Sequence, residues 1–258
     1  MKKVTVAVLM MVLLTSMLFA GCEGVVVGSG KLETKQFNFS DFSQVDIGSA
    51  FEFEIVHSDS YGVSITADDN LFEHIQVSKA GDTLAIDLKT ITNLGQVTLK
   101  AEIAMPELRG LDISGATRGT ASGFSSTEDV DIEVSGASSL ELVEISAGDV
   151  KCDISGASHV TGDITAADVN FTIGGASSIQ LEGSANDMVA MVGGASRMKL
   201  AAFPVNNADV KLDGASTGTV NLTGRLDANL DGASKLEYIG EPTMGAINTS
   251  GASTLSQK

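Results

Sequence analysis

The sequence predicts an all-β fold, a parallel β-helix (β-solenoid) whose coils contain about 20 residues. The first observation is an internal repeat, in which Gly-Ala is followed by Ser or Thr at spacings of 18–21 residues. The glycines of the copies are Gly115, Gly136, Gly156, Gly175, Gly194, Gly214, Gly232 and Gly251. A period near 20 residues is typical of stacked architectures, because a unit this small cannot bury its apolar face alone.

The second observation is the alternation of apolar and polar side chains around each copy. Val130, Ile132 and Val134 share one parity, whereas Asp131 and Glu133 share the other. The same frame fits the later coils, and it predicts strands because successive side chains of a strand point to opposite faces. After residue 105 no stretch keeps the apolar spacing of an amphipathic helix.

The same alternation predicts which side chains of the Gly-Ala-Ser motif point inward. Gly136 and Ser138 have the parity of the core aliphatics, so we expect them to point inward where the coil bends. Ala137 and its counterparts would then form an outward row. The opposite assignment, with alanine inside and serine outside, applies if the bend breaks the alternation.

Residues 1–21 have the features of a lipoprotein-type signal peptide. Lys2 and Lys3 precede an apolar run, and small residues precede Cys22, which is the expected lipidation site. An uncleaved membrane anchor is the alternative, because the run is close to the roughly 17-residue minimum for crossing a bilayer. Either interpretation places the rest of the chain outside the cytoplasm and anchors it to a membrane of the cell envelope. Residues 22–35 are then a flexible tether.

Residues 36–258 are predicted to form a single β-helix domain. Its first part, residues 36–110, is also strand-like but repeats less regularly, so we expect irregular N-terminal coils followed by the regular repeats of residues 111–258. A short helical turn is expected after Asp68, and six of the ten phenylalanines lie between Phe37 and Phe72. These aromatic residues predict a wider start to the solenoid.

Two segments resemble a known family. Residues 42–88, with a strand, a short helical turn and further strands, and the segment Pro106–Ala116 (Pro-x-Leu-x-x-Leu-x-x-Ser-Gly-Ala) are similar to the putative auto-transporter adhesin, head GIN domain family of exported bacterial proteins. The resemblance covers roughly residues 38–256. It implies a right-handed β-helix and a location in the cell envelope. It implies no established enzymatic activity, and therefore no catalytic residue is carried over.

Charge and cysteine content exclude some functions. The chain carries a net charge of −17, and removal of residues 1–21 takes away Lys2 and Lys3 and no acid, which brings the charge near −19. Such a surface repels nucleic acid, so we expect no nucleic-acid partner. Cys152 is the only cysteine besides Cys22, and its place in the frame predicts a buried, inert thiol.

We find no motif for catalysis or for a cofactor. His57, His74 and His159 are far apart and form no metal-binding pattern, so no metal site is predicted from them. Acidic residues such as Asp131 and Glu133 can stack in neighbouring coils, which leaves a weak Ca²⁺ site or a polysaccharide-cleaving carboxylate pair as less favoured alternatives. We expect no enzyme, no cofactor and no catalytic residue.

The outward position directly after each motif carries the candidate binding residues. We expect Arg118, Ser139, His159, Arg197 and Lys235 to form a candidate binding face. The leading hypothesis is a non-enzymatic cell-envelope lipoprotein that presents this face for adhesion to a glycan, an extended peptide or an envelope protein. A structural envelope or assembly module is the main alternative, and a polysaccharide-active enzyme is a weaker one.

Overall fold

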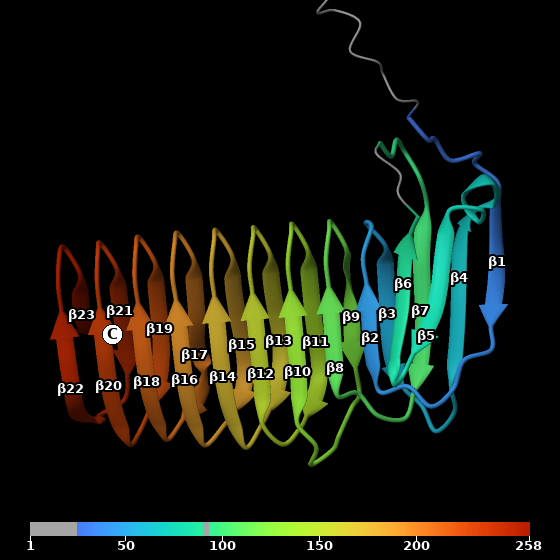
Figure 1. The fold of residues 1–258 in the computed structure, drawn as a ribbon. Coiled ribbons are helices and arrows are strands. Elements are labelled where there is room, and N and C mark those ends of the chain that lie inside the picture. Colours follow the sequence, from blue (N-terminus) through green and yellow to red (C-terminus); the bar gives the residue numbers. More distant parts are fainter. Residues whose placement is uncertain (1–24, 90–92) are drawn as a thin grey trace, which may run out of the picture.

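The computed structural model describes residues 25–89 and 93–258, which form two large β-sheets running along a rod (Figure 1). Within these ranges the one helical element is a 3-10 turn, η1 (Asp69–Leu71), which confirms the helical turn expected after Asp68. In the same two ranges we find no helix with the length and apolar character needed to cross a membrane. The predicted all-β solenoid is confirmed.

The first sheet has 12 strands and the second has 11. In spatial order, the 12-stranded sheet contains β1 (Leu32–Phe37), β4 (Gly62–Asp68), β7 (Leu99–Met105), β3 (Glu52–His57), β9 (Arg118–Ser122), β11 (Ser139–Ser146), β13 (His159–Thr165), β15 (Ser178–Ser184), β17 (Arg197–Val205), β19 (Thr217–Leu222), β21 (Lys235–Ile239) and β23 (Thr254–Gln257). The 11-stranded sheet contains β22 (Thr243–Thr249), β20 (Arg225–Leu230), β18 (Asn207–Leu212), β16 (Asp187–Val192), β14 (Asp168–Ile173), β12 (Val150–Ile154), β10 (Val130–Val134), β8 (Gly110–Ile113), β2 (Gln44–Ile47), β6 (Thr83–Leu88) and β5 (Ile75–Ala80).

Each coil of the regular part contributes one strand to each sheet, and the Gly-Ala-Ser segment forms the turn between them. Neighbouring coils pair in parallel and in register, so that Ile132 of β10 lies opposite Leu111 of β8 and Cys152 of β12. Because the register keeps the parity of every coil, apolar side chains stay inside along the whole rod.

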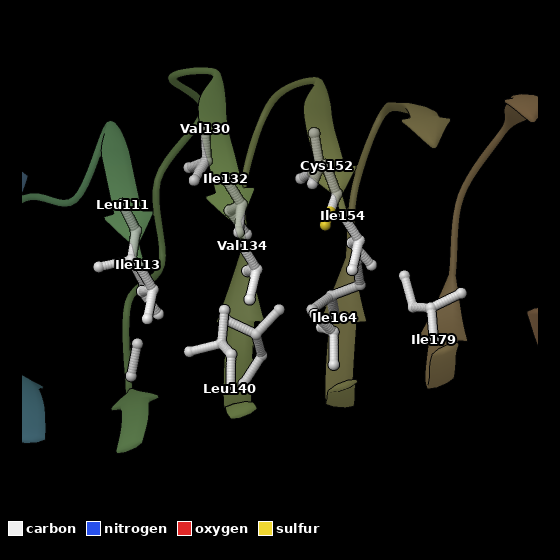
Figure 2. Close-up of a cluster of buried hydrophobic side chains, with 14 of the residues drawn as sticks. Leu111, Ile113, Val130, Ile132, Val134, Leu140, Cys152, Ile154, Ile164 and Ile179 are labelled. Carbon is white, nitrogen blue, oxygen red and sulfur yellow. The ribbon is translucent and has the colours of Figure 1, made fainter. Parts of the chain in front are cut away.

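The core lies between the two sheets. Figure 2 shows Val134 of β10 and Leu140 of β11, from opposite sheets, pointing into the same interior. Both side chains are fully buried, and so is Ile164 of β13. Burial of one such side chain contributes about 1.5–3 kcal/mol, so the stability of the rod comes from stacking many coils.

The turn corrects part of the predicted placement of the motif. Ser138 is buried and Ala137 is exposed, as expected, but Gly136 is exposed, so the prediction that the glycine points inward is wrong. Gly136 has a φ of 76°, a left-handed conformation that breaks the alternation at the turn. The glycine is therefore required by the backbone of the turn and not by a narrow interior.

The inward serines form a hydrogen-bonded row inside the solenoid. The backbone N–H of Ser138 donates to the hydroxyl of Ser158 (3.4 Å), and the N–H of Ser158 donates to the hydroxyl of Ser177 (3.2 Å). The hydroxyl of Ser138 donates to the carbonyl of Ser135 (2.8 Å). Buried hydroxyls are tolerated because these bonds offset the loss of water.

The N-terminal part departs from simple coils. β2 and β3 pair in parallel with β8 and β9, but β1, β4 and β5 pair antiparallel with their neighbours. The chain places β6 and β7 on the far side of β2 and β3 and then returns to β8, so spatial order differs from sequence order (Figure 1). Phe42, Phe51 and Phe53 are buried there, in agreement with the expected aromatic start.

The flexible tether predicted for residues 22–35 extends four residues too far, because β1 begins at Leu32. Residues 32–35 belong to β1, because all six residues of that strand pair with β4. Just before β1, the side chain of Asp68 accepts the N–H of Gly30 at 2.8 Å, and the N–H of Ser29 donates to the side chain of Asn70 at 2.9 Å. The signal peptide (1–21) and Cys22 lie outside the described residues, so these predictions stay as they are.

Candidate functional site

The candidate binding residues lie in one column on the outer face of the 12-stranded sheet. Each occupies the first position of its strand, and the ladders pair these positions directly. This outward column consists of Arg118, Ser139, His159, Ser178, Arg197, Thr217, Lys235 and Thr254. The structure therefore aligns Arg118, Ser139, His159, Arg197 and Lys235 along one line, and their role in binding stays a prediction.

Contacts within the outward column are polar. The His159 ring nitrogen Nδ1 lies 2.6 Å from the hydroxyl of Ser178 in the next coil. The Lys235 ammonium lies 2.6 Å from a carboxylate oxygen of Glu237, two residues along the same strand. Arg118 lies opposite Glu52 of β3. The column can therefore offer hydrogen-bond donors and cations to a ligand that lies on the sheet.

A second column, two residues further along each strand, was missed by reasoning from the motif alone. It consists of Thr120, Glu141, Thr161, Gln180, Lys199, Thr219, Glu237 and Ser256. The period-2 alternation is the signal that could have found it, because a residue two positions from an outward residue of a strand also points outward.

The two columns enclose a depression that we call the β19 groove. It has a volume of ≈ 440 Å³. Its lining includes Arg197, Lys199, Thr217, Thr219, Lys235 and Glu237. The short threonines of β19 lie between the long side chains of β17 and β21, and this difference in length makes the hollow.

The end of the β19 groove is widened by a bulge in β17. The register between β15 and β17 shifts between Gln180 and Glu182, and the register between β17 and β19 shifts between Lys199 and Pro204. Ala201 and Ala202 are consecutive and both exposed, as a bulge requires. Because alanine is small, the bulge leaves space at this end.

An acidic groove lies on the other sheet. It has a volume of ≈ 360 Å³, and Asp46, Asp112, Asp131, Glu133, Lys151 and Asp153 line it. Asp46, Asp112, Glu133 and Asp153 lie opposite one another on successive strands. Burial, and secondly the nearby Asp87, raises the pKa of Asp46, whereas burial followed by Asp46 and Glu133 raises the pKa of Asp112.

Another acidic row lies at the corners, where each side chain binds the backbone of the next coil. Asp129 accepts the N–H of Asp149 (2.8 Å), Asp149 accepts that of Asp168 (3.1 Å), and Asp168 accepts that of Asp187 (3.1 Å). Asp187 continues the row by accepting the N–H of Asn207 at 3.2 Å. These carboxylates hold successive corners together, which is a structural role that the sequence analysis described only as turn composition.

The remaining candidate groups do not form a site. Cys152 is buried, as predicted, and burial raises the pKa of its thiol to about 12, so it is not a nucleophile at neutral pH. Over residues 25–89 and 93–258, His, Cys, Asp and Glu form no group of three or more with an arrangement suited to a metal ion. His57, the last residue of β3, packs edge-on against Phe124 and does not belong to the outward column.

Comparison with known proteins gives a family and a fold. Residues 41–242 match the model of the family described as "Putative auto-transporter adhesin, head GIN domain". No curated protein matches the chain in sequence.

Solved structures share the fold at low sequence identity. A putative adhesin from Parabacteroides distasonis ATCC 8503 has a TM-score of 0.84 and 19% identity, and the match covers 91% of this chain and 100% of that one. A putative adhesin from Parabacteroides merdae ATCC 43184 has a TM-score of 0.81 and 18% identity, with 90% and 98% covered. A protein described as a putative lipid binding protein from Parabacteroides distasonis ATCC 8503 has a TM-score of 0.75 and 18% identity, with 91% and 100% covered.

Proposed function

Because this chain belongs to the family of putative auto-transporter adhesins with a head GIN domain, we propose that it is a non-enzymatic adhesin of the cell envelope. Its rigid rod presents the outer face of the 12-stranded sheet to an extended ligand, and a glycan chain is the ligand that this face suits best. Stacked repeats provide such surfaces because each coil adds an equivalent row of side chains.

The outward column is the single observation that supports this proposal most strongly. Residues from Arg118 to Thr254 are far apart in sequence, yet the parallel ladders align them one coil apart. They supply hydroxyls, an imidazole and cations, which are side chains that hydrogen-bond to sugars. A glycan is favoured over a peptide because the backbone groups of these strands already pair with neighbouring coils, which leaves no edge on this face for β-strand addition.

The proposal includes attachment to a membrane through a lipid on Cys22 and a location outside the cytoplasm. The sequence features of residues 1–21 support it, and the adhesin family agrees with a surface location. Metabolic labelling with a fatty-acid analogue tests the attachment. Label should appear on the natural protein and be absent from Cys22→Ser, and equal labelling of both proteins would contradict lipidation at this residue.

Binding is tested with a glycan array and single alanine substitutions in the outward column. We expect Arg118→Ala, His159→Ala, Arg197→Ala or Lys235→Ala to weaken retention of the bound glycans. Lys211→Ala is the matched control, because Lys211 is an exposed cation on the opposite sheet. Retention of no glycan, or unchanged retention by every variant, would contradict the proposal.

Cleavage of a polysaccharide is a second candidate function, and the acidic groove favours it. Asp46 and Asp112 lie opposite each other on adjacent strands, and a glycosidase uses a pair of neighbouring carboxyl groups. The adhesin proposal is better supported, because the family model that matches residues 41–242 describes a putative adhesin. Release of reducing ends from polysaccharides, abolished in Asp112→Asn, would support cleavage.

A further inference from the structure

We infer that the β19 groove is an anion-binding subsite for a carboxylated or sulfated glycan. This inference rests on the proposed function and names the class of glycan that the face binds. The groove lies on the outward column, and its charge differs from that of the rest of the molecule.

The β19 groove carries an excess of positive charge. The whole chain carries −17, but Arg197, Lys199 and Lys235 all line this one groove. Lys258 also lines it, whereas the acids among its lining residues are Glu182 and Glu237. An excess of cations in a surface hollow attracts and orients an anion.

The two cations of β17, Arg197 and Lys199, lack acidic partners among the described residues. Five cations outside β17 pair with an acid two residues along the chain, namely Lys35 with Glu33, Arg109 with Glu107, Lys151 with Asp153, Arg225 with Asp227, and Lys235 with Glu237. Among the described residues, Lys79, Lys89, Arg118, Lys211 and Lys258 form no salt bridge. In β17 the residue two positions from Arg197 is Lys199, a second cation. Among the described residues, neither forms a salt bridge.

The neighbouring coils also leave these two cations uncompensated. Arg197 lies between Ser178 and Thr217, and Lys199 lies between Gln180 and Thr219. All four neighbours are uncharged and can hydrogen-bond. An exposed pair of like charges next to each other raises the electrostatic free energy of the free protein, and an anion bound between them lowers it.

The shape of the groove and the chemistry of its walls indicate a sugar acid. A guanidinium such as that of Arg197 binds a carboxylate or sulfate through two parallel hydrogen bonds. The hydroxyls of Thr217 and Thr219 on the floor can bond to sugar hydroxyls. A flat anionic membrane is disfavoured, because the groove is recessed between β17 and β21 and the whole molecule repels it.

The position of the acids limits where an anionic group can lie on the outward column. Next to the β19 groove, a second hollow is lined by Glu141, Glu144, Asp163 and Glu182. These carboxylates repel an anionic group. The anionic group of a bound glycan therefore lies in the β19 groove, between the side chains of β17 and β21, and not in this second hollow.

Calorimetric titration of the full chain with two matched pairs of glycans tests this inference. The pairs are polygalacturonate with its methyl ester, and dextran sulfate with dextran. We expect an anionic glycan to bind at least about tenfold more tightly than its neutral counterpart, with an affinity that falls as salt is raised. In Arg197→Ala/Lys199→Ala the preference should disappear, whereas Lys211→Ala should bind within about twofold of the natural protein. Arg197→Lys should recover only part of the affinity, because lysine lacks the planar fork.

Failure of the inference is distinguishable from failure of the proposed function. Two results would overturn the inference and leave the adhesin proposal in place. One is equal binding of the neutral and the anionic glycans. The other is binding that is unchanged in Arg197→Ala/Lys199→Ala but weakened in Arg118→Ala or His159→Ala. Equal binding of poly-glutamate with the same dependence on Arg197 would replace the glycan with an acidic peptide. Absence of binding to every glycan in the titrations and on the array would overturn both.

Discussion

Gly175 lies directly against Gly156 of the preceding coil: a Cβ atom added to Gly175 would overlap the carbonyl oxygen of Gly156. The same carbonyl accepts the N–H of Ala176 at 2.8 Å, so the backbones of successive turns are held in contact. Glycine is therefore required at this position for two reasons. It leaves room for the carbonyl oxygen of the preceding coil, and it adopts the left-handed backbone conformation, with a φ of 76° at Gly175.

Two adjacent glycines provide a matched test of this packing. Gly175→Ala should lower the free energy of unfolding by more than about 2 kcal/mol, because the substitution is strained in φ and clashes with backbone. Gly174→Ala is the control, since a Cβ on Gly174 has no atom within 4 Å. Chemical denaturation of both variants measures the difference. Equal stabilities would contradict the role of the stacked glycine.

Asp168 separates the hydrogen bond of the corner row from its charge. Asp168→Ala removes the acceptor for the N–H of Asp187 and should cost about 1–2 kcal/mol. Asp168→Asn keeps an acceptor and removes one of several stacked like charges, so its thermal unfolding midpoint should equal or exceed that of the natural protein, most clearly at low salt. A loss of stability in Asp168→Asn as large as in Asp168→Ala would show that the charge itself is required.

The acidic groove makes the stability of the protein depend on pH. The folded-state pKa of Asp112 is raised above 3.8, so protonation of Asp112 favours folding. The ionised carboxylate destabilises the folded protein at neutral pH, and this destabilisation diminishes as pH falls through the raised pKa toward 3.8. Asp112→Asn should therefore stabilise the protein at pH 7 by about 0.2–1 kcal/mol. Denaturation at several pH values should show this advantage shrinking on acidification.

Asp227 is the control with the opposite sign. Hydrogen bonds from Arg225 and from the N–H of Ala246 lower its pKa to about 2, so its contribution to stability is present above 3.8 and lost as pH falls toward 2. Asp227→Asn should destabilise the protein at pH 7 and lose this effect in acid. A change in unfolding free energy of the same sign in Asp112→Asn and Asp227→Asn at pH 7 would contradict the assigned causes.

The thiol of Cys152 should be unreactive while the protein is folded. Its side chain is buried and its pKa is raised to about 12, so little thiolate is present and reagents cannot reach it. In Cys22→Ser protein, a thiol reagent should react more than about 100-fold faster after unfolding in denaturant than before. Rapid labelling of the folded protein would mean that β12 does not point Cys152 into the core.

The alternation of side chains was sufficient to predict most of the solenoid. Val134, Leu140 and Ser138 are inside and Ala137 is outside because each follows the period of a strand. Gly136 is the exception, because its positive φ interrupts the alternation, and a rule based on parity cannot include this change. The outward column could be predicted for the same reason that the core could, since register transfers the parity from coil to coil.

Contacts between coils could not be read from the sequence. The carboxylate of Asp149 binds the N–H of Asp168, and nothing near either residue in sequence distinguishes such an acid from an ordinary turn residue. The β19 groove depends on the relative lengths of side chains in three coils, with Thr217 between Arg197 and Lys235. The antiparallel pairing of β1 with β4 likewise depends on how distant segments meet.

The central claim is that the repeat aligns the outward residues of distant strands in one column, and a distance measurement tests it most directly. Spin labels placed through Ser139→Cys and Lys235→Cys in Cys22→Ser protein are separated by five strand spacings of the 12-stranded sheet. At about 4.8 Å per spacing, pulsed electron paramagnetic resonance should give one narrow distribution centred near 24 Å. A broad distribution, or one centred beyond about 35 Å, would contradict the in-register stacking on which the binding face depends.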